Sequence, residues 1–277
     1  VLHDETRGEI VANPALPPDV FNVPGGGQPG PVDAGLAATG EHNAQFHQQF
    51  AGLGIPLDGQ QLAVDPVEIA PGVWHVRGGS HNSLVVEQQA GVVVVEAPLY
   101  PARGDALLAW VRQALPTKPV THVVATHFHD DHSGGLRSFV AAGAKVVVGA
   151  PALGFYREAF RAPRTVSPDA LSAAPRPAVF EAVEPGGTKL LNDPVRPVNV
   201  VSIDTSHAAD MVVAEVGGTV FVSDIYSPGQ PPLGVTGLLE LRASVQAQNL
   251  AVTRYAGGHG QLGTPAELDQ LIDDLTP

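Results

Sequence analysis

Hydrophobic residues follow two different periods along the chain, and the two periods alternate. Short runs rich in valine and other β-branched residues predict strands at residues 73–77, 83–87, 92–96, 121–126 and 145–149. Apolar residues at helical spacing predict helices at residues 105–115, ended by Pro116, and at residues 134–142, ended by Gly143. Because strands and helices are interleaved, the first half of the folded region is predicted to be α/β.

The second half repeats this mixture. A strand is predicted at residues 198–203 and a hairpin with a Gly-Gly turn at residues 211–223, and residues 238–249 show a helical apolar face. A short strand and a final helix follow. The first turn of that helix carries the typical capping residues Thr264, Pro265 and Glu267. Two sheets packed face to face and covered by helices would accommodate all of these elements.

Proline and glycine interrupt the pattern in two places. The stretch at residues 163–197 is rich in proline and predicts long loops, which commonly shape substrate pockets. Residues 1–65 show little periodicity apart from one short helix predicted at residues 41–52. We therefore expect an irregular N-terminal extension, residues 1–65, and a main domain, residues 66–277. The extension is interpreted as an arm draped over this domain, or alternatively as a segment that forms a homo-oligomer.

Composition narrows the classes of partner. With a formal net charge of −13, the chain is a poor match for nucleic acid, whose affinity depends largely on lysine and arginine. No apolar run reaches the roughly 18 residues that a membrane helix needs, so we expect a soluble protein with a small-molecule substrate and no membrane partner. The absence of cysteine excludes disulfides, thiolate ligands and a cysteine nucleophile. A cytoplasmic and a bacterial-type periplasmic or secreted location both stay open.

A dense set of metal-binding residue types follows the strand predicted at residues 121–126. The motif His-Phe-His-Asp-Asp-His contributes His127, His129, Asp131 and His132. In an extended loop, His127 and His129 can converge on one ion, while Asp131 and His132 continue into the turn and can face a second. Imidazole and carboxylate together suit zinc, iron or manganese better than calcium or magnesium.

The segment Thr-His-Phe-His-Asp-Asp-His-Ser-Gly-Gly, which begins at Thr126, resembles the signature of the metallo-β-lactamase superfamily. The resemblance spans roughly residues 73–260 and implies an αββα four-layer sandwich with metals at one edge of its two sheets. It also implies three later ligands, and suitable residues follow later predicted strands: His207, Asp224 and His259. Taken alone, each of these would be an ordinary loop or turn residue. Their assignment therefore depends on the first motif.

This resemblance implies a site for two divalent metal ions, with zinc expected and iron or manganese as alternatives. The first ion would be bound by His127, His129 and His207. The second would be bound by Asp131, His132 and His259. Asp224 would bridge the two ions, as in the glyoxalase II, lactonase and broad hydrolase branches of the superfamily.

The function implied by such a site is hydrolysis. Two close divalent ions lower the pKa of a shared water and provide a metal-bridging hydroxide near neutral pH. Asp131 is expected to orient this hydroxide and to pass a proton to the leaving group. The expected target is an ester, lactone, thioester or amide bond, including a β-lactam. Two alternatives stay open: an iron-dependent oxidoreductase such as a sulfur dioxygenase, and a non-catalytic scaffold of the same fold.

Other histidines and several aromatic residues are weaker candidates. His81 lies in a loop before a predicted strand, where it could overhang the metals and touch substrate. The remaining histidines are expected to be structural or on the surface: His3, His42, His47, His75 and His122. Candidate walls of a substrate pocket are Phe155, Tyr156, Phe160 and Tyr226. The helical spacing of Tyr156 and Phe160 favours positions in the core for these two.

Overall fold

The computed structural model describes residues 15, 63–165 and 168–276. All helices and strands named below belong to the unit Gln61–Pro277. The helix expected at residues 41–52 lies outside the described residues, as does nearly all of the extension at residues 1–65, so both expectations stay predictions. Among the helices of the described part, none is both long enough and apolar enough to cross a bilayer.

In the described part of the chain, the first sheet has seven strands in sequence order. They are β1 (Asp65–Ala70), β2 (Val73–Arg77), β3 (Ser83–Glu87), β4 (Val92–Val95), β5 (Val120–Val124), β6 (Lys145–Gly149) and β7 (Phe180–Val183). The first four strands pair antiparallel, whereas β4 to β7 run parallel. The carboxyl ends of β4 and β5 therefore meet at the same edge of the sheet.

The second sheet has six strands among the described residues, in the order β13-β12-β11-β10-β9-β8. They are β8 (Thr188–Leu191), β9 (Val198–Ser202), β10 (Val212–Val216), β11 (Thr219–Val222), β12 (Arg254–Gly257) and β13 (Leu262–Gly263). Neighbouring strands are antiparallel except for β11 and β12, which are parallel. The carboxyl ends of β11 and β12 thus also share one edge.

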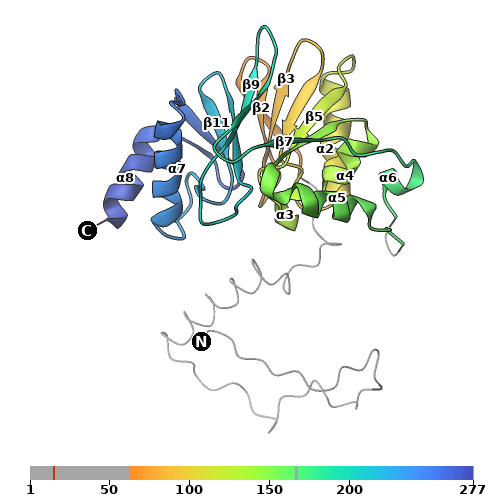
Figure 1. Ribbon diagram of the computed structural model, residues 1–277. Coiled ribbons are helices and arrows are strands. Elements are labelled where there is room, and N and C mark those ends of the chain that lie inside the picture. The colour runs from red at the N-terminus through yellow and green to blue at the C-terminus, as the bar shows by residue number, and fades with distance from the viewer. Residues whose placement is uncertain (1–14, 16–62, 166–167, 277) are drawn as a thin grey trace, which may run out of the picture. The chain divides into compact units, whose positions relative to one another are not determined.

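Helices cover the outer faces of the two sheets (Figure 1). Beside the first sheet lie α2 (Pro101–Ala114), α4 (Leu136–Ala141) and α5 (Leu153–Arg161). Beside the second sheet lie α7 (Thr236–Ala247) and α8 (Pro265–Leu275), and the expected capping box of Thr264 and Glu267 begins α8. Three short elements complete the fold: α3 (Asp130–Ser133), η2 (Ala150–Ala152) and α6 (Ala170–Ala173). The predicted α/β sandwich of two helix-covered sheets is confirmed.

The alternation of side chains along each strand divides the core into three layers. In β4, Val92 and Val94 pack with residues of α2 and α4, whereas Val93 and Val95 face the second sheet. The strand β10 alternates in the same way between the first sheet and the layer that contains α7 and α8. Because all four valines of β4 are fully buried, a shift of register by one residue would exchange their environments. Burial on both faces therefore fixes the register of each central strand, and with it the position of the residues that follow the strand.

The structure adds detail to the sequence predictions. The described part of the segment 163–197 is mostly loop, as expected, but it also contains α6, β7 and β8, which were not predicted; the two strands are short and partly exposed, which weakens their hydrophobic signal. The helix expected at residues 134–142 is shorter in the structure, where α4 begins at Leu136 and ends at Ala141; Gly134 and Gly135 separate it from the preceding turn α3. The strands β1 and β13 were not predicted, since β1 is partly exposed and β13 has two residues.

Hydrogen bonds join the two sheets at the edge where β5 and β12 end. The amide of Val212 donates to the carbonyl of Thr126 (2.8 Å). The Asn82 backbone amide donates to the Gly258 carbonyl (2.7 Å), and its side-chain amide donates to the carbonyls of Gly257 (2.9 Å) and Gly260 (3.0 Å). The loop after β2 is thereby held against the loop after β12, although the two are far apart in the sequence.

The loop after β5 approaches the segment after β4 too closely for a side chain at Gly134. The amide of Leu99 donates to the Asp131 carbonyl (2.7 Å), and the amide of Gly135 donates to the Ala97 carbonyl (2.8 Å). A Cβ atom added at Gly134 would lie 1.9 Å from the Leu99 carbonyl oxygen. The position of Asp131 therefore depends on the absence of a side chain three residues later.

We expect Gly134→Ala to lower the free energy of unfolding by about 1–3 kcal/mol, because an added methyl group would force the backbone to shift. Gly154→Ala is the matched control, since a Cβ at this position in α5 meets no atom within 4 Å. It should be neutral or stabilising by up to about 1 kcal/mol. Urea unfolding followed by circular dichroism measures both. Equal effects of the two substitutions would contradict the steric explanation.

Candidate metal centre

The strand β5 leads into the His-Phe-His-Asp-Asp-His segment at the sheet edge, as the sequence predicts. His127 and His132 are fully buried, whereas Phe128 is 39% exposed. The single turn of α3 carries Asp131 and His132 at consecutive positions. Within this turn the buried His132 side chain enters the site, while 47% of the Asp131 side chain stays open to solvent.

Three histidines and one oxygen of Asp224 form a first group of ligand atoms, which we call the first subsite. The Nε2 atom of His127 lies 3.0 Å from Nδ1 of His129 and 3.3 Å from Nε2 of His207. The Oδ2 atom of Asp224 lies 3.1 Å from Nε2 of His127 and 2.9 Å from Nε2 of His207. All four ligand atoms lie within 4.8 Å of one another. The structure thus brings together every residue expected at the first metal.

The residues expected at the second metal also meet, with the other oxygen of Asp224. The Nε2 atoms of His132 and His259 lie 3.0 Å and 2.9 Å from Asp224 Oδ1. The Oδ2 atom of Asp131 lies 3.5 Å from Nε2 of His132. We call these residues, with Oδ1 of Asp224, the second subsite. It receives side chains from both sheets, because His132 follows β5 and His259 follows β12.

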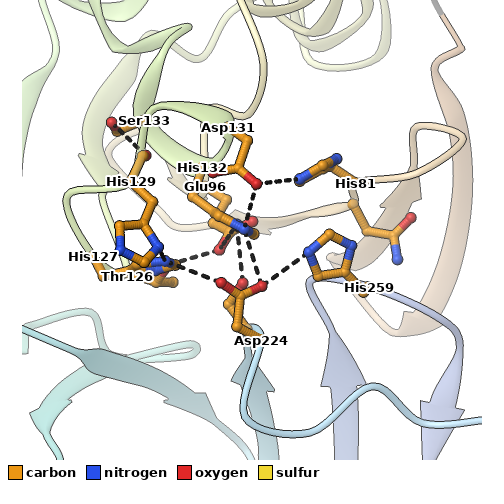
Figure 2. A network of polar contacts seen from close by, with 12 residues as sticks. His81, Glu96, Thr126, His127, His129, Asp131, His132, Ser133, Asp224 and His259 are labelled. Carbon is orange, nitrogen blue, oxygen red and sulfur yellow. Dashed lines mark hydrogen bonds and ion pairs between the residues drawn. The ribbon is translucent and has the colours of Figure 1, made fainter. Parts of the chain in front are cut away.

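The Asp224 carboxylate stands between the two subsites (Figure 2). Asp224 follows β11 and has a left-handed backbone conformation, with φ of 49°, which is uncommon for a residue other than glycine and is concentrated at functional sites. Burial opposes ionisation, but hydrogen bonds from His127, His132 and His207 and from His259 hold the pKa of Asp224 well below its usual range. The carboxylate is therefore ionised and shared between two pairs of imidazoles.

Glu96 is a part of the site that the sequence prediction missed. It is fully buried at the end of β4, where its φ is 65°. Its Oε1 atom accepts a hydrogen bond from the Thr126 hydroxyl (2.6 Å) and lies 3.0 Å from Nδ1 of His132. Burial would raise the pKa of Glu96, but the charge of His132 and its hydrogen bond lower it. The sequence signal that could have identified Glu96 is its position directly after four consecutive valines, where an acidic residue is unexpected.

His81 lies beside the second subsite rather than over both subsites. Its Nε2 atom is 3.4 Å from Oδ2 of Asp131, and its ring centroid is 4.3 Å from that of His259. Burial lowers the pKa of His81, and the hydrogen bond to Asp131 offsets this only in part. Burial also opposes ionisation of Asp131, but the hydrogen bond from His81 and the charge of His132 lower its pKa to about 2. Asp131 is thus ionised at neutral pH.

The donor set fits divalent cations. The facing nitrogens of His127 and His129, 3.0 Å apart, can share at most one proton, and the buried Nε2 atom of His132 faces carboxylate oxygens of Asp224 (3.0 Å) and Asp131 (3.5 Å). Facing polar atoms of this kind are costly to bury unless a cation or proton lies between them. Negative charge is supplied by Glu96, Asp131 and Asp224. Imidazole nitrogens with carboxylate oxygens are a preferred environment for zinc, iron and manganese.

Protons and cations compete for the nitrogen atoms of this centre. Although burial disfavours the charged imidazolium, Glu96 and Asp224 hold the pKa of His132 well above its usual value, and Asp224 raises the pKa of His259. A metal ligand must release its proton, so cation binding to these residues should weaken as the pH falls.

The candidate pocket residues have different environments. Tyr156 is buried, and its hydroxyl donates to the His127 carbonyl (2.9 Å), so it supports the loop after β5 from the core. Phe160 packs against the same core, and Tyr226 is buried beside the second sheet. Neither tyrosine can be a pocket wall. Phe155, by contrast, is 49% exposed.

The other histidines of the described chain lie outside the two subsites. His75 directs Nε2 to the Gly257 carbonyl (2.9 Å), and His122 lies on β5 at 3.9 Å from Glu181. Three further histidines lie outside the described residues: His3, His42 and His47. A structural role for His75, predicted from the sequence, agrees with its position between β2 and the end of β12.

The sequence of this chain matches a known protein family. The sequence profile of the metallo-beta-lactamase superfamily matches residues 76–239. That segment contains all residues of the two subsites except His259.

Solved structures share the fold. The metallo-beta-lactamase from Pontibacter korlensis superposes with a TM-score of 0.59 at 20% identity, over 76% of this chain and 98% of that one. A metallo-beta-lactamase from Hirschia baltica gives a TM-score of 0.56 at 18% identity, over 78% and 99% of the two chains. At these identities the likeness concerns the fold alone.

Two alkylsulfatases from Pseudomonas resemble a part of the sequence. An (R)-specific secondary-alkylsulfatase is 33% identical over 74 residues, which cover 26% of this chain and 11% of the relative. A linear primary-alkylsulfatase is 33% identical over 97 residues, which cover 33% of this chain and 14% of the relative. The matched segments thus span only about a tenth to a seventh of these relatives' length.

We expect the purified protein to bind two zinc ions per chain, and Asp224→Ala to lose tight binding of both, because the substitution removes an oxygen atom from each subsite. Asp204→Ala, at an exposed carboxylate in the same loop as His207, is the matched control and should bind zinc normally. Zinc content and calorimetric titration measure the effect, and affinity should fall from pH 7 to pH 5. Unchanged stoichiometry in Asp224→Ala would contradict the bridging role.

Proposed function

Because the chain belongs to the metallo-β-lactamase superfamily, we propose that it is a dinuclear metal-dependent hydrolase. The expected substrate is a small molecule with an ester, lactone, thioester or amide bond, and β-lactams are one kind of amide in this class. The observation that carries the proposal is the Asp224 carboxylate, whose oxygen atoms face two different pairs of histidines. Zinc is the expected metal at both subsites.

Asp131 is the residue best placed to handle the proton of the reaction. When bound, two close divalent ions lower the pKa of water between them and polarise the bond under attack. The Asp131 carboxylate is half-exposed on one side and faces His81 and His132 on the other. Because its pKa of about 2 keeps it ionised, it can accept a hydrogen bond from the attacking water, orient it, and deliver the proton to the leaving group.

The surrounding buried groups hold the histidines in one orientation. Glu96 faces Nδ1 of His132, and the Ser80 carbonyl accepts a hydrogen bond from Nδ1 of His259 (2.7 Å). Contacts of this kind fix the ring and leave its other nitrogen free to bind a cation. A site built in this way reorganises little during the reaction, which favours catalysis over simple metal storage.

Two exposed aromatic side chains support a substrate with an apolar part. Phe128 and Phe155 are 39% and 49% exposed, and their ring centroids lie 5.6 Å apart. The ring of Phe128 also lies 4.8 Å from that of His129, a residue of the first subsite. We call this pair the aromatic ledge. Exposed apolar surface beside a reactive centre is a common place for the apolar part of a substrate.

A sulfate monoester of an alkyl alcohol is a second candidate substrate. It is supported by the partial sequence similarity to the two alkylsulfatases, and the aromatic ledge would suit an alkyl chain. The matched segments are short compared with those relatives, so this substrate class is placed second. A panel that includes alkyl sulfates beside carboxylic esters, lactones, thioesters and β-lactams distinguishes the two.

We expect Asp131→Ala to lower kcat/KM on the best substrate of that panel by about 10²–10⁴-fold, the usual range for loss of a group that handles a proton. Asp130→Ala is the matched control, because the neighbouring carboxylate is exposed and belongs to neither subsite. Its kcat/KM should stay within about twofold of wild type. Activity that survives Asp131→Ala would contradict the proposed mechanism. A single iron ion with oxygen consumption would favour the oxidoreductase alternative.

We expect Phe155→Ala to raise KM about tenfold for substrates with a long apolar chain, with little change in kcat. The reason is the loss of roughly 1–1.5 kcal/mol of apolar contact from a side chain that is half-covered before binding. Leu275→Ala, at an exposed leucine at the end of α8, is the control. A KM shift of the same size for acetyl and long-chain substrates would contradict a role of the aromatic ledge in chain binding.

A further inference from the structure

The loop between β2 and β3 brings one additional imidazole to the second subsite. His81 lies in this loop, and Asn82 ties it to the carbonyls of Gly257 and Gly260. The ring of His81 lies next to both histidines of the second subsite, with centroid distances of 4.3 Å to His259 and 4.8 Å to His132, which are themselves 5.1 Å apart. The loop therefore carries His81 to the second subsite rather than to the first.

The orientation of His81 matches that of the histidines already assigned to metals. Its Nδ1 atom lies 2.8 Å from the Ser80 hydroxyl, which leaves Nε2 directed to the centre. His132 and His259 show the same arrangement, with Nδ1 facing Glu96 and the Ser80 carbonyl. Histidines that bind metals usually donate the other ring N–H to such an oxygen atom. In contrast, His75 uses its Nε2 atom for a backbone carbonyl.

The distances around His81 also suit direct ligation. Its Nε2 atom lies 3.4 Å from Asp131 Oδ2, which is in turn 3.5 Å from Nε2 of His132. Neighbouring ligand atoms of one zinc ion, with bonds of about 2.0–2.1 Å, lie roughly 3–3.5 Å apart in four- and five-coordinate geometry. Ligand atoms of His81, His132 and His259 all lie within 4.8 Å of one another.

Burial argues against a role for His81 in substrate contact. His81 is 7% exposed, whereas Asp131, which it faces, is half-exposed. A substrate that approaches the centre from solvent therefore meets Asp131 before it meets His81. A buried imidazole directed at other imidazoles is better explained by a shared cation than by contact with substrate.

We propose that His81 is a further ligand of the metal in the second subsite. The inference rests on the proposed dinuclear function and adds to it. With His81 included, each subsite contains three imidazole nitrogens and one oxygen of Asp224: His127, His129 and His207 in the first, and His81, His132 and His259 in the second. Asp131 is an additional oxygen donor that only the second subsite has. The second metal is then the more fully enclosed by protein ligands.

The test compares zinc affinity of the full chain in wild type, His81→Gln and His81→Ala. Glutamine keeps a side-chain N–H that can reach Asp131 but removes the imidazole. If His81 is a ligand, both variants should bind the second zinc ion more than 100-fold more weakly, since loss of an outer hydrogen-bonding partner alone costs about 10–100-fold. Affinity for the first ion should be unchanged. His122→Ala, at a histidine outside both subsites, is the matched control. Chelator competition gives the two affinities, and the visible spectrum of cobalt-loaded protein reports the change of ligands.

The outcomes separate this inference from the proposed function. A wild-type chain that binds fewer than two zinc ions contradicts the dinuclear proposal and the role of His81 with it. If wild type binds two ions and His81→Gln binds the second equally well, the dinuclear site stands, and His81 acts through its hydrogen bond to Asp131. Circular dichroism of the variants identifies any loss of folding, and the unchanged first ion provides an internal reference in the same molecule.

Discussion

The Asp224 carboxylate is the group on which the organisation of the site depends. Its Oδ2 atom faces His127 and His207, and its Oδ1 atom faces His132 and His259. A buried carboxylate stays ionised only where donors or cations surround it. Because those donors arrive from several different loops, each loop must end at a defined point relative to β11. The fold therefore has to hold the edges of both sheets in one fixed arrangement.

Backbone contacts between the sheets provide that arrangement. The Val212 amide meets the Thr126 carbonyl at the end of β5, and Asn82 connects the loop after β2 to the turn after β12. Buried polar groups then orient individual rings, as Glu96 does for His132. Each of these contacts crosses between segments that are remote in sequence. Mutation of a residue that touches no substrate can thus disturb the centre by moving one of its loops.

The residues of the two subsites are informative about the proposed nucleophile, water, but not about the substrate. Imidazoles and carboxylates in two subsites are suited to activating water, and water can attack many kinds of bond. In the proposed hydrolase, discrimination between substrates would depend on surfaces outside the ligand set, such as the aromatic ledge of Phe128 and Phe155. The superfamily thus constrains the chemistry, while the identity of the substrate depends on this chain's own loops.

The sequence by itself determined the α/β character, most strands and the four candidate ligands His127, His129, Asp131 and His132, because valine runs, capping residues and the His-Phe-His-Asp-Asp-His motif are local signals. His207, Asp224 and His259 could be named only through family resemblance, since a single histidine or aspartate after a strand carries little information. Only the tertiary structure showed which groups orient the histidines, namely Glu96 at His132 and the Ser80 carbonyl at His259. It alone also showed that His81 lies at the second subsite, beside Asp131. Their roles depend on distances between loops that no local pattern records. The same holds for β7 and β8, whose partly exposed residues become strands through pairing with β6 and β9.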